Sequence, residues 1–203
     1  YLGTVNRKEK DPYKEEAKQL KKEIYQRAPL KAQYEEEILK SLKHVSIPKF
    51  IRKIEDRDLA GYILEYKTGA TLEDVIYDQK HIFTRSEIYN IGKQLIDIMR
   101  YLHEKGVVHR DIRVSNTLLN GNSIYLVDFG LARWIDNEKY KADIDFSYFG
   151  DLLLHLYYTS FEGKSRKGKP WYEELALSSD ELILLKRLMG IKKRYKSINE
   201  VEV

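Results

Sequence analysis

Apolar residues recur at helical spacing in several stretches of the chain, and these stretches predict its helices. The clearest stretch runs from about Arg85 to Glu104. A capping box formed by Thr84 and Glu87 precedes it, and Gly106 follows its end. Further helices are expected over residues 7–28, 30–42, 145–159 and 179–189, with a short one beginning at Thr71.

The hydrophobic period shortens between these stretches and predicts strands. Short strands are expected at residues 47–51 and 61–66, and a second pair at residues 117–119 and 124–127 with a hairpin turn between its members. The break at residues 67–70 is the expected boundary between two lobes. Because strands and helices come first and helices dominate afterwards, the order indicates an α+β fold.

Composition limits the classes of protein that the chain can belong to. Of 203 residues, 42% are hydrophobic and 33% are charged, as in globular proteins. The 36 basic and 32 acidic residues are interspersed, so we expect no nucleic-acid partner. No apolar run reaches the roughly 18 residues of a membrane helix, and the first residues lack a secretory pattern. The absence of cysteine excludes disulfides and thiolate chemistry, and we expect a cytoplasmic protein.

Two motifs carry the candidate chemistry. Residues 109–116 read HRDIRVSN, and residues 128–130 read DFG. This combination resembles the protein kinase superfamily. Residues 35–44 (EEEILKSLKH) are similar to the C-helix of that family, residues 63–66 to the strand that enters its hinge, and residues 145–150 to the start of its buried F-helix. The resemblance covers roughly residues 30–200 and is closest to small, minimal prokaryotic or atypical Ser/Thr kinases.

The resemblance implies a two-lobed, α+β protein-kinase-like fold. It places a reduced N-lobe at residues 1–66 and a truncated, mostly helical C-lobe at residues 67–203. Its implied activity is the Mg²⁺-dependent transfer of the ATP γ-phosphate to a Ser or Thr hydroxyl of a protein. The cofactors would be ATP and one or two Mg²⁺ ions, and Glu65, Tyr66 and Lys67 would contact the nucleotide at the hinge.

The resemblance also implies a role for each motif residue. Asp111 would accept or orient the proton of the attacking hydroxyl, and Arg113 would neutralise charge on the γ-phosphate. Asp128 offers Mg²⁺ a hard carboxylate, and Asn116 offers it an amide oxygen. We expect His109 and Asp145 to be structural instead, with Asp145 accepting backbone N–H bonds from the catalytic loop.

The phosphate-binding lysine is less well defined. In the family, a C-helix glutamate pairs with a strand lysine that holds the α- and β-phosphates. Glu35 is the candidate glutamate, because Ile38 and Leu39 then take the buried positions of the helix. Glu36 and Glu37 are the neighbouring alternatives. Lys8 is the candidate lysine, with Lys10 and Lys14 as alternatives.

The chain departs from the family pattern in two places. It contains no G-x-G-x-x-G loop, which in kinases covers the phosphates, so weaker ATP binding is expected. Only 14 residues separate Gly130 from Asp145, and no A-P-E follows. Tyr140 is the only hydroxyl in that interval, and we expect activity not to depend on its phosphorylation. A small-molecule alcohol kinase and a nucleotide-binding pseudokinase are the alternative functions.

Overall fold

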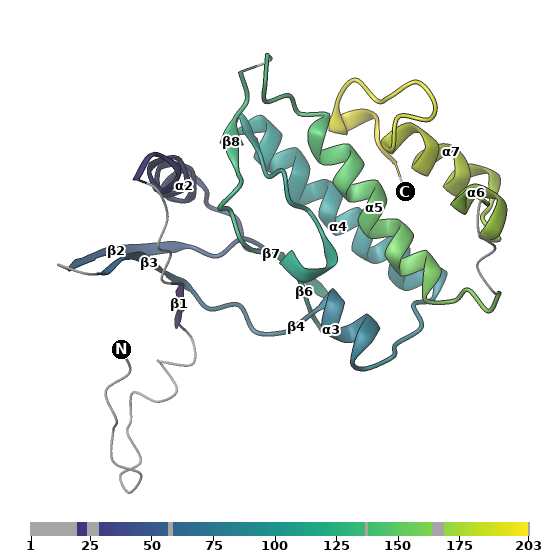
Figure 1. The fold of residues 1–203 in the computed structure, drawn as a ribbon, viewed down its shortest axis with the longest axis horizontal. Coiled ribbons are helices and arrows are strands. Elements are labelled where there is room, and N and C mark those ends of the chain that lie inside the picture. Colours follow the sequence, from purple (N-terminus) through teal and green to yellow (C-terminus); the bar gives the residue numbers. More distant parts are fainter. Residues whose placement is uncertain (1–19, 24–28, 57–58, 137, 164–168, 203) are drawn as a thin grey trace, which may run out of the picture.

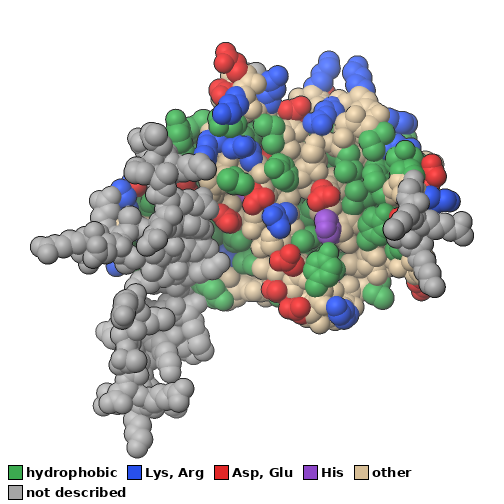
Figure 2. All heavy atoms as spheres, viewed as in Figure 1, with side chains coloured by type: hydrophobic (Ala, Val, Ile, Leu, Met, Phe, Trp, Pro, Cys, Tyr) green, Lys and Arg blue, Asp and Glu red, His purple; other side chains and the backbone are tan. Residues whose placement is uncertain are grey.

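The structure is a computed structural model of the chain, and it describes residues 20–23, 29–56, 59–136, 138–163 and 169–202. Figure 1 shows a small sheet with one helix beside it, followed by a larger part built mainly from long helices. Figure 2 shows acidic and basic side chains interspersed on the face in view, in keeping with a formal net charge of +4.

The first sheet has three antiparallel strands in the order β1-β3-β2. Its strands are β1 (Leu20–Glu23), β2 (Phe50–Asp56) and β3 (Leu59–Glu65). The predicted helix over residues 7–28 is therefore wrong at Leu20–Glu23, where the backbone pairs with β3. Lys and Glu are good helix formers, but pairing with a neighbouring strand overrides that weak local preference.

Helix α2 (Pro29–Ser41) packs beside β2 and confirms the helix predicted over residues 30–42. Ile38, Leu39 and Leu42, at its carboxyl end, are almost fully buried. They belong to the same hydrophobic core as the long helices of the second part. The core therefore fixes α2 against the rest of the molecule.

Three long helices form the second part: α4 (Arg85–Glu104), α5 (Ile144–Tyr158) and α7 (Ser179–Leu188). Helix α5 lies between α4 and α7, and its Phe146 and Phe149 are completely buried (Figure 1). The predicted capping box of Thr84 and Glu87 is present, and Ser178 caps α7 in the same way. Among the described residues, no helix has the length and apolarity needed to cross a membrane.

Short elements connect these helices and hold the site. Helix α3 (Leu72–Tyr77) has the predicted cap at Thr71, and Gly121 occupies the predicted hairpin turn with a positive φ of 57°. The remaining elements are β4 (Ala70–Thr71), β5 (Val107–Val108), η1 (Val114–Asn116), β6 (Thr117–Asn120), β7 (Ser123–Leu126), β8 (Arg133–Trp134), α6 (Trp171–Glu174) and η2 (Ile198–Glu200). The strand order is β4-β6-β7 in one sheet, while β5 pairs with β8.

Candidate active site

The catalytic loop is fastened to helix α5 by a buried carboxylate. Asp145 is completely buried, and its two oxygens accept the backbone N–H groups of His109 at 3.0 Å and Arg110 at 2.7 Å. The Nε2 atom of His103 lies 3.1 Å from the same carboxylate. Arg110 has a positive φ of 66°, which costs free energy for a side chain with a Cβ atom. The bonds to Asp145 hold that conformation, as the structural role predicted for Asp145 requires.

His109 is a buried scaffold residue. Its Nδ1 accepts the N–H of Asp111 at 3.3 Å, and its Nε2 donates to the carbonyl of Val127 at 3.2 Å. Its ring also packs edge-on against Phe129, with 4.7 Å between the ring centroids. Burial lowers the pKa of His109, so its imidazole is neutral at pH 7. These contacts join the two motifs and leave His109 no access to a substrate hydroxyl.

Asp111 and Asn116 form a direct pair in this loop. The Nδ2 of Asn116 donates to the Asp111 carboxylate at 2.8 Å and to the Asp111 carbonyl at 3.0 Å. The Asn116 amide nitrogen is therefore turned toward Asp111, which leaves the amide oxygen as the group that can accept a cation. The 3₁₀ turn η1 fixes this geometry, because the N–H of Asn116 donates to the carbonyl of Arg113.

Asp128 is brought close to this pair through the backbone. The N–H of Val127 donates to the carbonyl of Asn116 at 2.9 Å, so the two motifs lie side by side. Asp128 has a positive φ of 61°, and its Oδ1 accepts the N–H of Gly130 at 3.1 Å. A carboxylate oxygen and an amide oxygen are ligands that suit Mg²⁺. The donor set therefore fits the predicted metal.

Asp128 lines a cavity of about 220 Å³ together with residues from both parts of the molecule. The predicted hinge residues Glu65, Tyr66 and Lys67 all line it. The other lining residues, which sequence reasoning did not single out, are Pro48, Leu64, Gly69, Thr71, Ser115, Leu118 and Val127. The cavity thus joins the hinge to the metal-binding motif and is the candidate nucleotide site.

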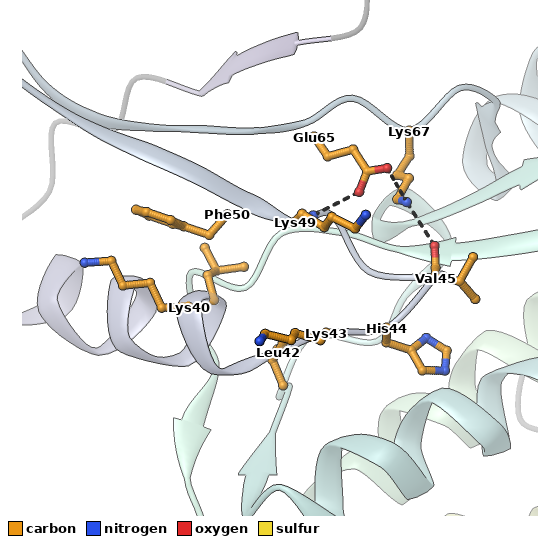
Figure 3. A pocket seen from close by; sticks show the side chains of 10 residues that line it. Lys40, Leu42, Lys43, His44, Val45, Lys49, Phe50, Glu65 and Lys67 are labelled. Atoms are coloured by element: carbon orange, nitrogen blue, oxygen red, sulfur yellow. Dashed lines mark hydrogen bonds and ion pairs between the residues drawn. The ribbon is translucent and has the colours of Figure 1, made fainter.

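The Glu65 side chain is occupied within the protein. Its carboxylate lies 3.0 Å from the Lys67 ammonium and accepts the backbone N–H of Lys49 at 3.2 Å (Figure 3). Partial burial raises the pKa of Glu65, but the bonds from Lys67 and Lys49 outweigh it and leave that pKa below its usual value. Contacts from the hinge to a nucleotide would therefore come from backbone groups or from Tyr66.

Position 69, which lines the cavity, must be occupied by glycine. The sequence pattern indicates only a break between elements at residues 67–70. The φ of Gly69 is +140°, and a Cβ atom there would lie 2.7 Å from the carbonyl oxygen of Leu119. Only glycine accepts both this conformation and this close approach of two backbones. The sequence shows that a glycine follows the hinge, but it does not show that the backbone of Leu119 packs against that glycine.

The structure also describes two further predicted residues, Arg113 and Glu35. Arg113 is exposed, and its carbonyl accepts bonds from Asn116 N–H and Thr117 Oγ1, so its backbone is fixed. Glu35 is 1% exposed on α2, whereas Glu36 pairs on the surface with Lys40. Of the three adjacent glutamates Glu35 alone is buried, and its pairing with a phosphate-binding lysine stays a prediction. The predicted lysine Lys8 and its alternatives Lys10 and Lys14 lie outside the described residues.

Hydrogen bonds fix the described residues of the segment after Gly130. Strand β8 pairs with β5, and the N–H of Ile135 donates to the carbonyl of Gly106 at 2.7 Å. The Asp136 carboxylate then accepts the backbone N–H groups of Glu138, Lys139 and Tyr140 at 2.7–3.0 Å. The Arg110 guanidinium lies 4.7 Å from the centre of the Tyr140 ring.

Comparison with known proteins places this geometry in a family. The protein kinase domain matches residues 4–157. The chain is 34% identical over 185 residues to a Bacillus subtilis protein named "Probable serine/threonine-protein kinase YbdM", covering 88% of this chain and 72% of that protein. It is also 34% identical over 112 residues to the CTD kinase subunit alpha of Schizosaccharomyces pombe, covering 55% of this chain and 19% of that protein.

A third relative is the mouse NUAK family SNF1-like kinase 1, which is 34% identical over 105 residues. That match covers 51% of this chain and 16% of the mouse protein. The chain thus spans most of the Bacillus relative but less than a fifth of the other two. With a family match over more than half of its length and a mixed α+β fold, the chain belongs to the protein kinase family.

Proposed function

We propose that this chain is a serine/threonine protein kinase that transfers the γ-phosphate of ATP to a protein hydroxyl. The observation that carries the proposal is the contact between Asp111 and Asn116 beside Asp128, which lines a cavity together with the hinge residues. Phosphoryl transfer needs an acceptor group, metal ligands and a nucleotide pocket within one site. In this proposal Asp111 is the proton acceptor, Asn116 and Asp128 are the metal ligands, and the cavity beside the hinge is the nucleotide pocket.

The proposed roles follow from the chemistry of each side chain. The substrate hydroxyl oxygen bonds to the γ-phosphorus while the bond to the β–γ bridging oxygen breaks, and ADP leaves with the electron pair. Asp111 orients the hydroxyl and accepts its proton. Arg113, which is exposed beside the loop, faces the growing charge on the transferred phosphoryl group. Asp128 and Asn116 hold Mg²⁺, which would neutralise phosphate charge when bound.

The phosphate-binding lysine of this proposal has more than one candidate. Lys8 remains the sequence-based candidate. The position of β1 beside β3 adds Lys21 and Lys22, which lie on a strand of the same sheet. We propose that one of these lysines, or one of the alternatives Lys10 and Lys14, pairs functionally with Glu35. Lys→Met variants at each position, assayed for ATP affinity, would identify it.

The substrate class and setting are part of the same proposal. Among the relatives, YbdM carries serine/threonine-protein kinase in its name, and we extend that class to this chain. We also propose that the chain divides into an N-lobe of residues 1–66 and a C-lobe of residues 67–203. We further propose that its substrate is a protein and that it is located in the cytoplasm. Two results would replace the proposed protein kinase activity by another function. One is phosphoryl transfer to a small alcohol, and the other is nucleotide binding without phosphoryl transfer.

The test is a transfer assay with γ-labelled ATP, Mg²⁺ and either casein or a mixture of small alcohols as acceptor. Label should appear on Ser or Thr after acid hydrolysis of the protein acceptor, and chelation of Mg²⁺ should abolish it. Asp111→Asn should lower the transfer rate by roughly 10²–10⁴-fold while ATP still binds. Label on the alcohols alone, or equal rates in wild type and Asp111→Asn, would contradict the proposal.

A further inference from the structure

A second cavity, of about 560 Å³, adjoins the candidate nucleotide site at the hinge. We call it the lysine-rimmed pocket. Its lining residues are Leu39, Lys40, Leu42, Lys43, His44, Val45, Lys49, Phe50, Glu65 and Lys67. Figure 3 shows that they come from the end of α2, the loop after it, the start of β2 and the hinge. Within the part of the chain that the structure describes, the pocket and the candidate nucleotide cavity share Glu65 and Lys67.

The floor and one edge of this pocket are apolar. Leu39 and Leu42 are buried in the core and form its base, and Phe50 is half-buried beside them. Val45, at the edge, is 76% exposed. A concave site of this size with an apolar floor can receive one bulky apolar side chain.

The rim is strongly basic. It carries Lys40, Lys43, Lys49 and Lys67, against the single carboxylate of Glu65. Lys40 is paired with Glu36, and Lys67 with Glu65. Among the described residues, no carboxylate forms an ion pair with the ammonium group of Lys43 or Lys49. The charge of Lys49 also acts on Glu65, where it helps to lower the pKa of that carboxyl. This one carboxylate therefore faces both Lys67 and Lys49, and the rim keeps an excess of positive charge that can attract an anionic partner.

From this arrangement we infer that the lysine-rimmed pocket docks an acidic peptide segment of a partner protein, with one bulky apolar residue inserted into its floor. Charge complementarity selects the acidic segment, because Lys43 and Lys49 would each meet a carboxylate. The apolar floor selects a peptide over a nucleic acid, which would use only the lysines. A partner docked here sits next to the nucleotide cavity without covering it. The inference does not depend on the proposed function.

The experiment measures binding of short fluorescent peptides by anisotropy. The probes are peptides of Asp and Glu around one central Phe, Leu or Trp, each compared with a version that carries Ala at the centre. We expect saturable binding of at least one probe, and an affinity about tenfold lower when the apolar residue is Ala. A peptide of the same length with Lys in place of the acids should not bind.

Matched protein variants locate the binding site. Lys43→Glu with Lys49→Glu should weaken binding by about tenfold or more, because both exposed cations are reversed. The control is Lys93→Glu with Lys192→Glu, which makes the same change in net charge at exposed positions away from the pocket. It should bind within about twofold of wild type. Circular dichroism melts of both double variants report whether each is folded.

Several results would overturn the inference. One is that none of the three probes binds the folded wild-type protein at millimolar concentration. Another is that the Ala-centred peptide, or an oligonucleotide of equal charge, binds as tightly as the Phe, Leu and Trp probes, since the surface would then be merely electrostatic. Equal losses in the pocket variant and the control variant would show that binding follows net charge and not this pocket.

Discussion

Asn116 and Asp128 offer a cation different kinds of oxygen. The carboxylate of Asp128 attracts a cation by its full charge, whereas the amide of Asn116 contributes only a dipole. Asp128→Ala should therefore abolish Mg²⁺-dependent ATP binding, while Asn116→Ala should weaken it less. Calorimetric titration of Mg·ATP into both variants measures the difference. Wild-type affinity in Asp128→Ala would exclude this residue as the metal ligand.

Gly69 and Gly106 both have a positive φ, but an added Cβ would clash with a neighbouring backbone only at Gly69 of the two. Substitutions at these positions therefore distinguish the cost of the positive φ from that of the clash. At Gly69 a Cβ would lie 2.7 Å from a backbone oxygen, whereas at Gly106, with φ of +73°, it would meet nothing within 4 Å. We expect Gly69→Ala to lower the free energy of unfolding by about 2–3 kcal/mol and Gly106→Ala by about 1 kcal/mol. Urea unfolding of both variants measures these values, and equal losses would show that the backbone at Gly69 relaxes.

The motif residues could be predicted because the segments HRDIRVSN and DFG resemble motifs of the protein kinase superfamily. In the structure Asn116 contacts Asp111, the backbone of Val127 binds that of Asn116, and Asp145 accepts the loop N–H groups, while the catalytic and metal-binding roles stay predictions. The lining of the nucleotide cavity could not be predicted in this way. Residues such as Pro48 reach it from distant segments, and only the packing of the whole chain brings them there.

At the scale of elements, the described residues between Gly130 and Asp145 are held by hydrogen bonds from backbone N–H groups to the Asp136 carboxylate. Asp136 accepts three consecutive N–H groups, so phosphorylation has little disorder to remove. Tyr140→Phe should keep the transfer rate within about twofold of wild type, because Arg110 can still stack on the ring. The assay compares this variant with phosphatase-treated wild type. A large loss of activity in either sample would reveal a regulatory switch.

Helices and strands could be predicted where the hydrophobic pattern and the capping residues of the segment itself are clear. Helix α4 could be predicted to the residue, because its stripe is long and both ends carry caps. The charged strand β1 could not, since its Lys and Glu residues favour a helix and only the neighbouring β3 selects a strand. Strands of two residues, such as β5 and β8, are too short to show any period.

At the scale of the whole molecule, Lys67 connects the loop after α2 with the hinge. Its ammonium pairs with Glu65 and donates to the carbonyl of Val45 at 2.9 Å, and its side chain is 9% exposed. Lys67→Met removes both bonds while keeping most of the side-chain volume. We expect the free energy of unfolding at pH 7 to fall by about 1–2 kcal/mol. Chemical denaturation measures this difference.

The same pair predicts a dependence on pH. The pKa of Glu65 is lowered in the folded protein, so its stabilising contribution is present above the usual pKa of the group. It disappears as the pH falls through the lowered value, because the protonated carboxyl no longer pairs with Lys67. The stability gap between wild type and Lys67→Met should therefore narrow in acid. A gap that stays constant from pH 7 to pH 3 would show that the ion pair contributes nothing.

The bond between Asp145 and the catalytic loop has a consequence for how the molecule opens. The N–H groups of His109 and Arg110 are bound to a carboxylate that lies inside the helical core, 36 and 35 residues further along the chain. Exchange of these amide hydrogens with solvent requires the core around α5 to separate from the loop. The two amides should therefore exchange as slowly as those of α5 itself, so that active-site geometry is lost only with the helical core.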